Sequence, residues 1–197
     1  MARHFSVRLA ILLQSRIDTH RMSSKPQSQA PTIYLIRHGE KPPKSPNGDD
    51  EDGLSALGLS RAQALVNVFS RESKYNIGYI IAQHPKKDGS QNRPYLTVSP
   101  LAESLKPHVD FNHEIHRDDA DKVAQAALGY TGTGNVLICW EHHHLTDIAS
   151  AIGVVDAPAY PDDRYDVIWT LESPYDKISS VTSEHCQGLD DQYANEA

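Results

Sequence analysis

The chain has 197 residues and a formal net charge of −7 at pH 7, with 39% hydrophobic and 23% charged residues. This length suits one domain with a sizeable core, and no apolar run reaches the roughly 18 to 20 residues of a membrane-spanning helix, so we expect one globular domain and no membrane association. The negative charge gives no electrostatic reason to bind nucleic acid, and the two cysteines cannot build a disulfide framework.

The first thirty residues are predicted to be an extension that precedes the domain. They carry four arginines against one acid, Asp18, and end in a stretch rich in Ser, Gln and Pro. Their apolar core, residues 9–13, is short for a secretory signal, and we expect a cytoplasmic protein. An Arg-rich, acid-poor leader is also typical of mitochondrial import, so a targeting peptide and a disordered extension are both open interpretations of residues 1–30.

Strands and helices are predicted to alternate from Thr32 onward. Short β-branched and aliphatic runs predict strands at 32–36, 79–82, 135–140 and 165–171. Apolar positions at helical spacing predict helices at 60–72, 94–105, 118–128 and 145–152. This alternation indicates an α/β domain at residues 31–183, a three-layer αβα sandwich with a mostly parallel sheet, followed by a loose tail at 184–197.

Polar side chains gather where three of the predicted strands end. Residues 37–40, Arg-His-Gly-Glu, follow the first strand, Arg93 lies after the second, and residues 141–144, Glu-His-His-His, follow the strand at 135–140. Ligands of parallel sheets bind beyond the carboxyl ends of the strands, where the loops converge. Two arginines and two histidines at one such edge predict a site for a compact dianion, because a buried phosphate needs paired cations.

The run IYLIRHGE at 33–40 resembles the signature of the histidine phosphatase superfamily. Three further segments occur in the family's order: LSALGLSRA at 54–62 is similar to the segment after the catalytic loop, RPYLT at 93–97 to the second arginine motif, and VLICWEH at 136–142 to the second-histidine strand. The resemblance extends from about residue 32 to residue 171 and is greatest to the phosphoglycerate mutase-like branch, which implies that fold.

The resemblance implies a phosphatase that forms a phosphohistidine on His38, which water then hydrolyses. Arg37, Arg93 and His142 would hold the phosphate oxygens, and Gly39 would let the backbone approach the phosphate closely. The arginines would supply the positive charge that a metal supplies elsewhere, so we expect no metal and no other cofactor.

Three features depart from the family pattern. Residues 86–92 are an insertion before Arg93, and three histidines stand where the family has one, which leaves His143 as the alternative to His142. The general acid lacks its usual sequence neighbours, so Glu141 is the first candidate, ahead of Glu40 and Glu103. The residues alone do not decide between these acids.

The expected substrate is a small phosphorylated molecule or a phosphoprotein. A phosphoglycerate mutase-type phosphotransfer is an alternative, but it needs a closed pocket, and the sequence has no obvious lid beyond the loop at 41–53. A protein phosphohistidine phosphatase is a second alternative, suited to an open site. From another class, the chain could be an inactive module that binds phosphorylated ligands, although His38 beside Arg37 favours an enzyme. The sequence does not indicate the oligomeric state.

Overall fold

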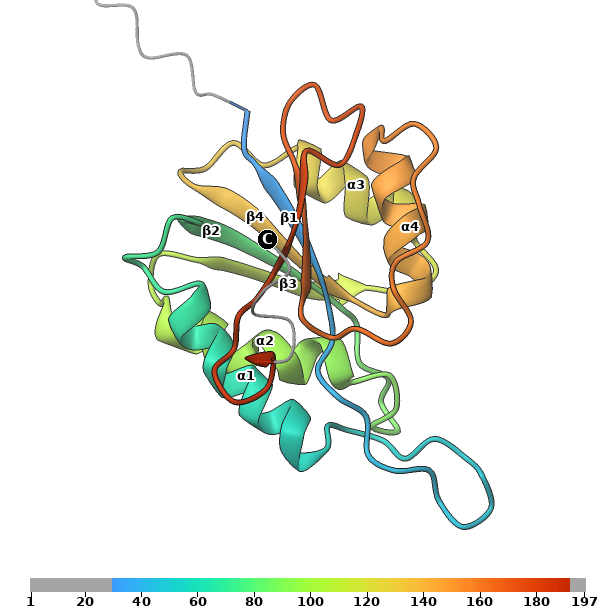
Figure 1. Cartoon of the computed structure of the whole chain (residues 1–197). Coiled ribbons are helices and arrows are strands. Elements are labelled where there is room, and N and C mark those ends of the chain that lie inside the picture. Colours follow the sequence, from blue (N-terminus) through green and yellow to red (C-terminus); the bar gives the residue numbers. More distant parts are fainter. Residues whose placement is uncertain (1–29, 192–197) are drawn as a thin grey trace, which may run out of the picture.

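A six-stranded mixed sheet forms the centre of the computed structural model, which describes residues 30–191 (Figure 1). The predicted extension, apart from Ala30, and residues 192–197 lie outside the described residues. The strands are β1 (Ile33–Arg37), β2 (Ile77–Gln83), β3 (Asp110–Ile115), β4 (Asn135–Trp140), β5 (Val167–Leu171) and β6 (Ser180–Ser183). Their order is β3-β2-β4-β1-β5-β6. Strands β1 to β4 run parallel, and β5 and β6 pair antiparallel at one edge.

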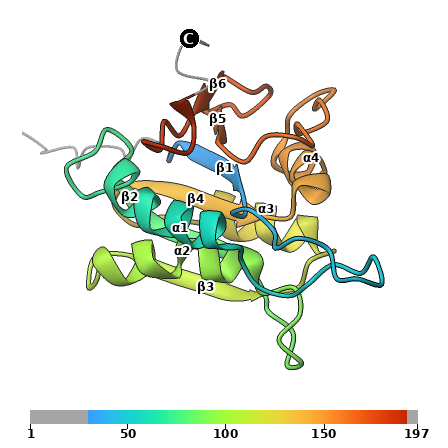
Figure 2. The same cartoon turned by 60° about the horizontal axis from the view of Figure 1, so that its bottom comes forward.

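Two pairs of helices cover the two faces of this sheet (Figures 1 and 2). The helices are α1 (Ala56–Val68), α2 (Arg93–Ser104), α3 (Ala120–Leu128) and α4 (His142–Ile152). Alternate residues of the central strands point to opposite faces: Leu35 packs in the core under α3 and α4, and Ile36 in the core under α1 and α2. The predicted three-layer α/β sandwich with a mostly parallel sheet is therefore confirmed.

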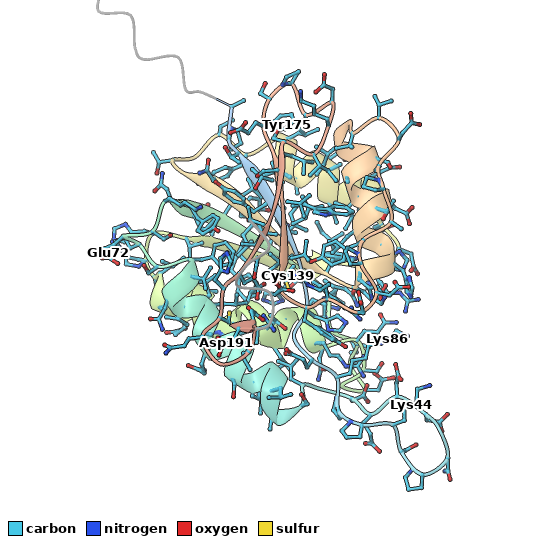
Figure 3. All side chains as sticks on the ribbon, viewed as in Figure 1. Lys44, Glu72, Lys86, Cys139, Tyr175 and Asp191 are labelled. Atoms are coloured by element: carbon cyan, nitrogen blue, oxygen red, sulfur yellow. The ribbon has the colours of Figure 1, made fainter. Side chains whose placement is uncertain are left out.

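The apolar runs of the central strands explain why their positions are predictable. All five residues of β1 are buried, because a parallel strand covered on both faces has no solvent-facing side. Cys139 is fully buried in β4 at the middle of the sheet (Figure 3), in keeping with its place in an apolar run. No helix in the described part of the chain is long and apolar enough to cross a membrane.

Two helices begin earlier than the sequence predicted. Helix α1 starts at Ala56, not residue 60, and ends at Val68, because the Ser55 side chain caps it by accepting a hydrogen bond from the Gly58 amide at 3.1 Å. Helix α4 starts at His142, not residue 145. Its N-cap is Glu141, whose carboxylate accepts a hydrogen bond from the His143 amide at 3.1 Å. The three histidines therefore form the first turn of a helix and not a loop.

The tail predicted to be loose from residue 184 is packed as far as residue 190. Glu184 and Asp190 are 3% and 2% exposed, and both pair with Arg61 of α1. The prediction was wrong over this stretch because acidic residues are usually solvated, whereas here a buried arginine on a distant helix compensates their charge.

Candidate active site

The loop that follows β1 is held by the neighbouring strand and by two helices. The His38 amide donates to the Trp140 carbonyl of β4 at 3.1 Å, and the Gly39 amide donates to the Thr97 hydroxyl of α2 at 2.8 Å. A Cβ at position 39 would lie 3.0 Å from the carbonyl oxygen of Gly58 in α1. Only glycine allows α1 to approach this loop so closely.

His38 is fixed in one tautomer. Its side chain is buried, and Nδ1 lies 2.7 Å from the carbonyl oxygen of Gly39. A carbonyl can only accept, so Nδ1 carries the hydrogen and Nε2 keeps a free lone pair. The pKa of His38 is lowered to about 3, mainly by burial and to a lesser extent by the positive charges of Arg37 and Arg93, whereas the hydrogen bond to the Gly39 carbonyl acts to raise it. His38 is therefore a neutral imidazole with an available Nε2.

A cavity of about 450 Å³ opens beside His38 at the carboxyl edge of the sheet. This volume lies within the range of small-molecule sites. The charged and imidazole side chains that line it are His38, Lys41, Asp50, Asp52, Arg93, Arg117, Glu141, His143 and His144. Cations and acids thus meet around one buried imidazole.

Arg37 lies beside this cavity but is not among the residues that line it. The side chain is buried, and Nη1 donates to the backbone carbonyls of Asp162 at 2.6 Å and Arg164 at 3.1 Å. The guanidinium carbon lies 4.0 Å from the centre of the Tyr165 ring. Among the described residues Nε has no hydrogen-bond partner. A buried guanidinium with an unused donor is suited to receive an anion.

Arg93, the first residue of α2, lines the cavity near His38. Its Nε donates to the Gly53 carbonyl at 2.9 Å, and its Nη2 donates to the carbonyl of Glu51. Two backbone carbonyls of the loop at 41–53 therefore fix the orientation of this guanidinium. Figures 1 and 2 show the same loop projecting from the domain, and Figure 3 places Lys44 on this loop.

The two candidate second histidines occupy different environments. His142 is buried, with Nδ1 at 2.6 Å from Glu141 Oε1 and Nε2 at 3.2 Å from Asp162 Oδ1. The first contact has the distance of an ion pair but not the alignment of a hydrogen bond. Burial lowers the pKa of His142, as does Arg37, whereas Glu141 opposes the shift. His143 is exposed and lines the cavity, whereas His142, the histidine that the sequence favoured, is not among the residues that line it. The two ring centres are 3.9 Å apart.

The three candidate acids are separated clearly by the structure. Glu141 lines the cavity. Glu40 points away to Arg61, whose Nη2 lies 2.8 Å from its carboxylate. Glu103 is exposed on α2, does not line the cavity, and pairs with Lys106 at 2.5 Å. Of the three candidate acids in the sequence, only Glu141 is therefore placed to exchange a proton with a molecule in the cavity.

Several residues at the site carried no clear signal in the sequence. Asp162 lies in the irregular segment between α4 and β5, yet it contacts both Arg37 and His142. Arg117 follows β3, an edge strand that the sequence did not predict, so its place at a strand end was hidden. Lys41 directly follows the signature run, and that position could have indicated it.

The insertion at 86–92 forms part of the cavity wall through Ser90 and Gln91. The buried Gln83 of β2 anchors this wall, because its Nε2 donates to the Gln91 carbonyl at 3.3 Å. Lys86 lies on the same loop (Figure 3). The insertion therefore does not displace Arg93 from the site.

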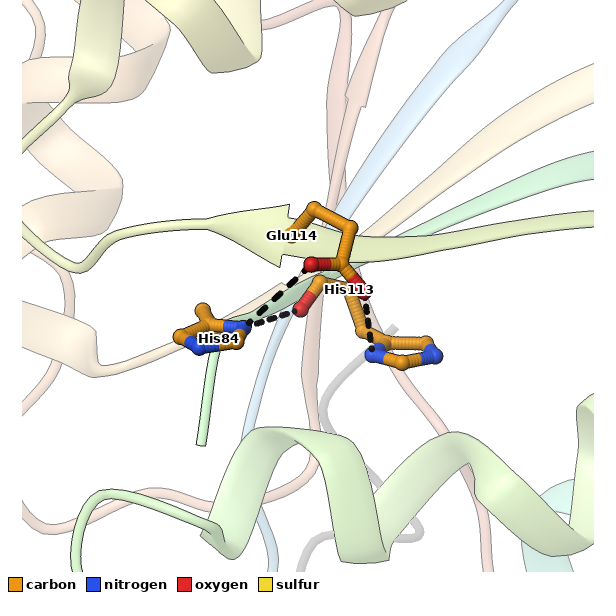
Figure 4. Close-up of side chains that lie close together, drawn as sticks. All are labelled: His84, His113 and Glu114. Atoms are coloured by element: carbon orange, nitrogen blue, oxygen red, sulfur yellow. Dashed lines mark hydrogen bonds and ion pairs between the residues drawn. The ribbon is translucent and has the colours of Figure 1, made fainter. Parts of the chain in front are cut away.

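Within residues 30–191, three groups of side chains each bring three possible metal-ligand atoms within 4.8 Å of one another. The first, Glu141, His142 and His143, could hold an ion at the cavity. The second group is His84, His113 and Glu114, at the ends of β2 and β3 (Figure 4). There His84 Nδ1, which lies 4.0 Å from the Glu114 carboxylate, donates to the His113 carbonyl at 2.8 Å. That nitrogen carries a proton and is not free to bind metal.

The third group, Glu184, Cys186 and Asp190, surrounds the guanidinium of Arg61, which supplies a positive charge in place of an ion. Arg61 is 2% exposed and also binds Glu40. Burial lowers the pKa of Arg61, but Glu184, Glu40 and Asp190 outweigh burial and raise it. Burial raises the pKa of Glu184 to about 8, against the lowering effect of the Arg61 charge.

The fold and the site together define an α/β protein with an imidazole and an arginine pair at the carboxyl edge of its sheet. No protein-family model matches the sequence, and no curated protein matches it. Solved structures do resemble it. SixA from Agrobacterium tumefaciens superposes with a TM-score of 0.51 at 13% identity, over 78% of this chain and 98% of that chain.

The protein histidine phosphatase SixA in complex with tungstate superposes with a TM-score of 0.55, also at 13% identity, over 78% of this chain and 97% of that chain. At this level of identity the likeness concerns the fold. The chain has the fold of the histidine phosphatase superfamily, in agreement with the resemblance of its sequence motifs.

Proposed function

We propose that the chain is a phosphatase that acts on phosphomonoesters through a phosphohistidine on His38. The observation that carries this proposal is the state of His38: a buried, neutral imidazole with a free Nε2 at the wall of a cavity that also holds Arg93 and Lys41. The fold likeness to a histidine phosphatase that binds tungstate, a tetrahedral oxyanion like phosphate, supports it.

In the first step Nε2 of His38 attacks phosphorus, a P–N bond forms, and the P–O bond to the leaving group breaks. Arg93, which lines the cavity, and Arg37, which directly precedes His38, are the proposed ligands of the equatorial oxygens. His142 is the proposed third ligand. The Gly39 carbonyl stabilises the positive charge that His38 gains on phosphorylation, because it accepts the Nδ1 hydrogen.

Glu141 is the proposed proton carrier. It donates a proton to the leaving oxygen in the first step, and its carboxylate then takes a proton from the water that attacks the phosphohistidine. The second step releases phosphate, breaks the P–N bond and restores neutral His38. Glu141 fits this role because it lines the cavity, and its carboxylate lies 2.6 Å from Nδ1 of His142.

Hydrolysis of protein phosphohistidine is a second candidate. Asp50, Asp52 and His143 are exposed at the cavity, so a peptide side chain could enter from solvent. The name of the tungstate-bound neighbour, a protein histidine phosphatase, favours the same substrate class. This reaction needs no general acid from the protein, because the imidazole of the substrate can take a proton from solvent on its other nitrogen and then departs readily.

The direct test is hydrolysis of an aryl phosphate and of a phosphohistidine peptide by the purified protein with excess chelator. We expect phosphate release and an acid-labile phosphate on the chain during turnover. Release that requires an added metal ion would contradict the expected metal independence and would favour an ion bound at Glu141, His142 and His143. Binding of tungstate without any turnover would favour the inactive binding module.

The pH dependence of kcat/KM should report the state of His38. Its pKa of about 3 means that the nucleophile loses its lone pair only when the pH falls below that value. We therefore expect kcat/KM to fall on the acid side only at about pH 3. Activity should be kept at about pH 5, where an ordinary histidine would be protonated. Circular dichroism at each pH checks that the protein stays folded. A limb near about pH 6.5 would contradict a buried, neutral His38.

His142→Ala should lower kcat more than His143→Ala. His142 lies between Glu141 and Asp162, beside Arg37, and its loss should cost about 10²-fold, which is typical when one donor to the transition state is removed. His143 is exposed and contributes only to the wall of the cavity, so its loss should cost less. Steady-state rates of both variants on one aryl phosphate decide the order, and the reverse order would make His143 the second catalytic histidine.

A further inference from the structure

A buried ionic network joins the C-terminal segment, residues 184–190, to the loop that carries His38. At its centre is Arg61 of α1, with Nη1 at 2.6 Å from Glu184 and Nη2 at 2.8 Å from both Asp190 and Glu40. The arginine and its two C-terminal partners are at most 3% exposed. Nothing in the proposed chemistry uses these groups directly.

Glu40 connects this network to the nucleophile. Its carboxylate accepts hydrogen bonds from Nε of Arg61 as well as Nη2, at 3.1 and 2.8 Å, so the two groups are held in a fixed relative orientation. Glu40 directly follows Gly39, and its own carbonyl accepts from the Ser55 amide at 2.9 Å. Both ends of Glu40 are thus fastened to α1.

The position of Glu40 fixes the direction of the Gly39 carbonyl. That carbonyl belongs to the peptide bond between Gly39 and Glu40, so a rotation of Glu40 would turn it away from His38. The carbonyl is the group that holds the hydrogen on Nδ1 and leaves Nε2 free. The orientation of one peptide plane therefore decides which nitrogen of His38 can attack.

We propose that Arg61 is a positioning residue: together with Glu184 and Asp190 it orients Glu40, and through the Gly39 carbonyl it sets the reactive tautomer of His38. This inference rests on the proposed role of His38 as a nucleophile. It makes the segment at 184–190 part of the frame of the active site, although none of its residues lines the cavity.

A substitution at Asp190 can weaken the network without changing a residue that lines the cavity. Its Oδ1 accepts from Arg61 Nη2 at 2.8 Å, and its Oδ2 accepts from the Cys186 amide at 2.7 Å. Asparagine has the same size, but one of its two terminal atoms becomes a donor that faces another donor. Asp190→Asn therefore loosens the segment at 184–190 without a change in volume. The matched control is Asp191→Asn, the same substitution at the exposed neighbour.

The experiment compares wild type, Asp190→Asn and Asp191→Asn with two aryl phosphates whose leaving groups differ in pKa, and records the ¹⁵N resonances of the His38 ring. For Asp190→Asn we expect kcat to fall about tenfold on both substrates with an unchanged KM, because misplaced reacting groups slow the chemical step. The resonances should show hydrogen on Nε2 as well as Nδ1. Asp191→Asn should match wild type in both measurements.

Two other outcomes would overturn the inference. A wild-type rate and a wild-type ring spectrum in Asp190→Asn would show that the network does not reach His38. A loss of rate that grows with the pKa of the leaving group would indicate a proton-transfer defect in place of mispositioning. If the wild-type protein releases no phosphate, the proposed function fails, and the ring spectrum of Asp190→Asn still decides by itself whether the network sets the tautomer.

Discussion

Replacing His38 with alanine should lower kcat for an aryl phosphate by about 10³-fold or more, because it removes the imidazole that lines the cavity and whose Nδ1 hydrogen bond leaves Nε2 free to attack. The acid-labile phosphate on the chain should disappear with the activity. Binding of tungstate, measured by calorimetry, should survive in part, since Arg37 and Arg93 remain to hold an oxyanion.

The control for this variant is His108→Ala, a loss of imidazole at an exposed position after α2. It should leave both the rate and the phosphoenzyme unchanged. If His38→Ala kept the wild-type rate, the nucleophile would have to be another group, and the phosphohistidine mechanism would be wrong for this chain.

Arg61→Met should reduce the free energy of unfolding by about 3 to 5 kcal/mol, the usual cost of removing one partner from a buried ionic cluster. Methionine matches the arginine stem in volume, so the loss reports charge and hydrogen bonds more than packing. Glu40 and Asp190 would be left as neighbouring carboxylates without a compensating cation. Urea unfolding at pH 7 measures the change, and Arg61→Lys should lose less because it keeps the charge but not the planar fork.

Arg71→Met is the comparison for this second prediction. Arg71 follows α1, is exposed, and makes one hydrogen bond, 3.3 Å long, to the Leu105 carbonyl. Its replacement should change the free energy of unfolding by no more than about 0.5 kcal/mol. Equal effects of the two substitutions would mean that the buried network contributes nothing beyond a surface arginine.

The sequence predicted the parts of the fold that depend on local pattern. Strands β1 and β4 are continuous apolar runs because they are buried on both faces, and such runs are visible without tertiary information. Strands β3 and β6 were missed, since at the two sheet edges their residues are mostly exposed or half-buried and show no apolar run. The early start of α4 was missed because glutamate at an N-cap is a weaker signal than serine or aspartate.

The candidate site was predictable where it lies at the end of a recognisable strand. His38, Arg93 and Glu141 all line one cavity, as their positions after β1, β2 and β4 indicated. Which histidine of the triplet faces the cavity depends on how the first turn of α4 is rotated about the helix axis. The sequence pattern does not predict this rotation. The contacts of Asp162 depend on the path of an irregular segment, which has no periodicity to read.

The partners of Arg61 also bear on the order in which the molecule assembles. Glu184 and Asp190 are 123 and 129 residues away along the chain, so they are synthesised long after α1. During synthesis the strands that build the sheet centre, β1, β2 and β4, are complete long before residue 184 emerges. A nascent chain therefore completes the strands at the sheet centre before it can complete the Arg61 network. If Arg61 positions the His38 loop as proposed, a competent nucleophile requires the last residues of the domain to be made.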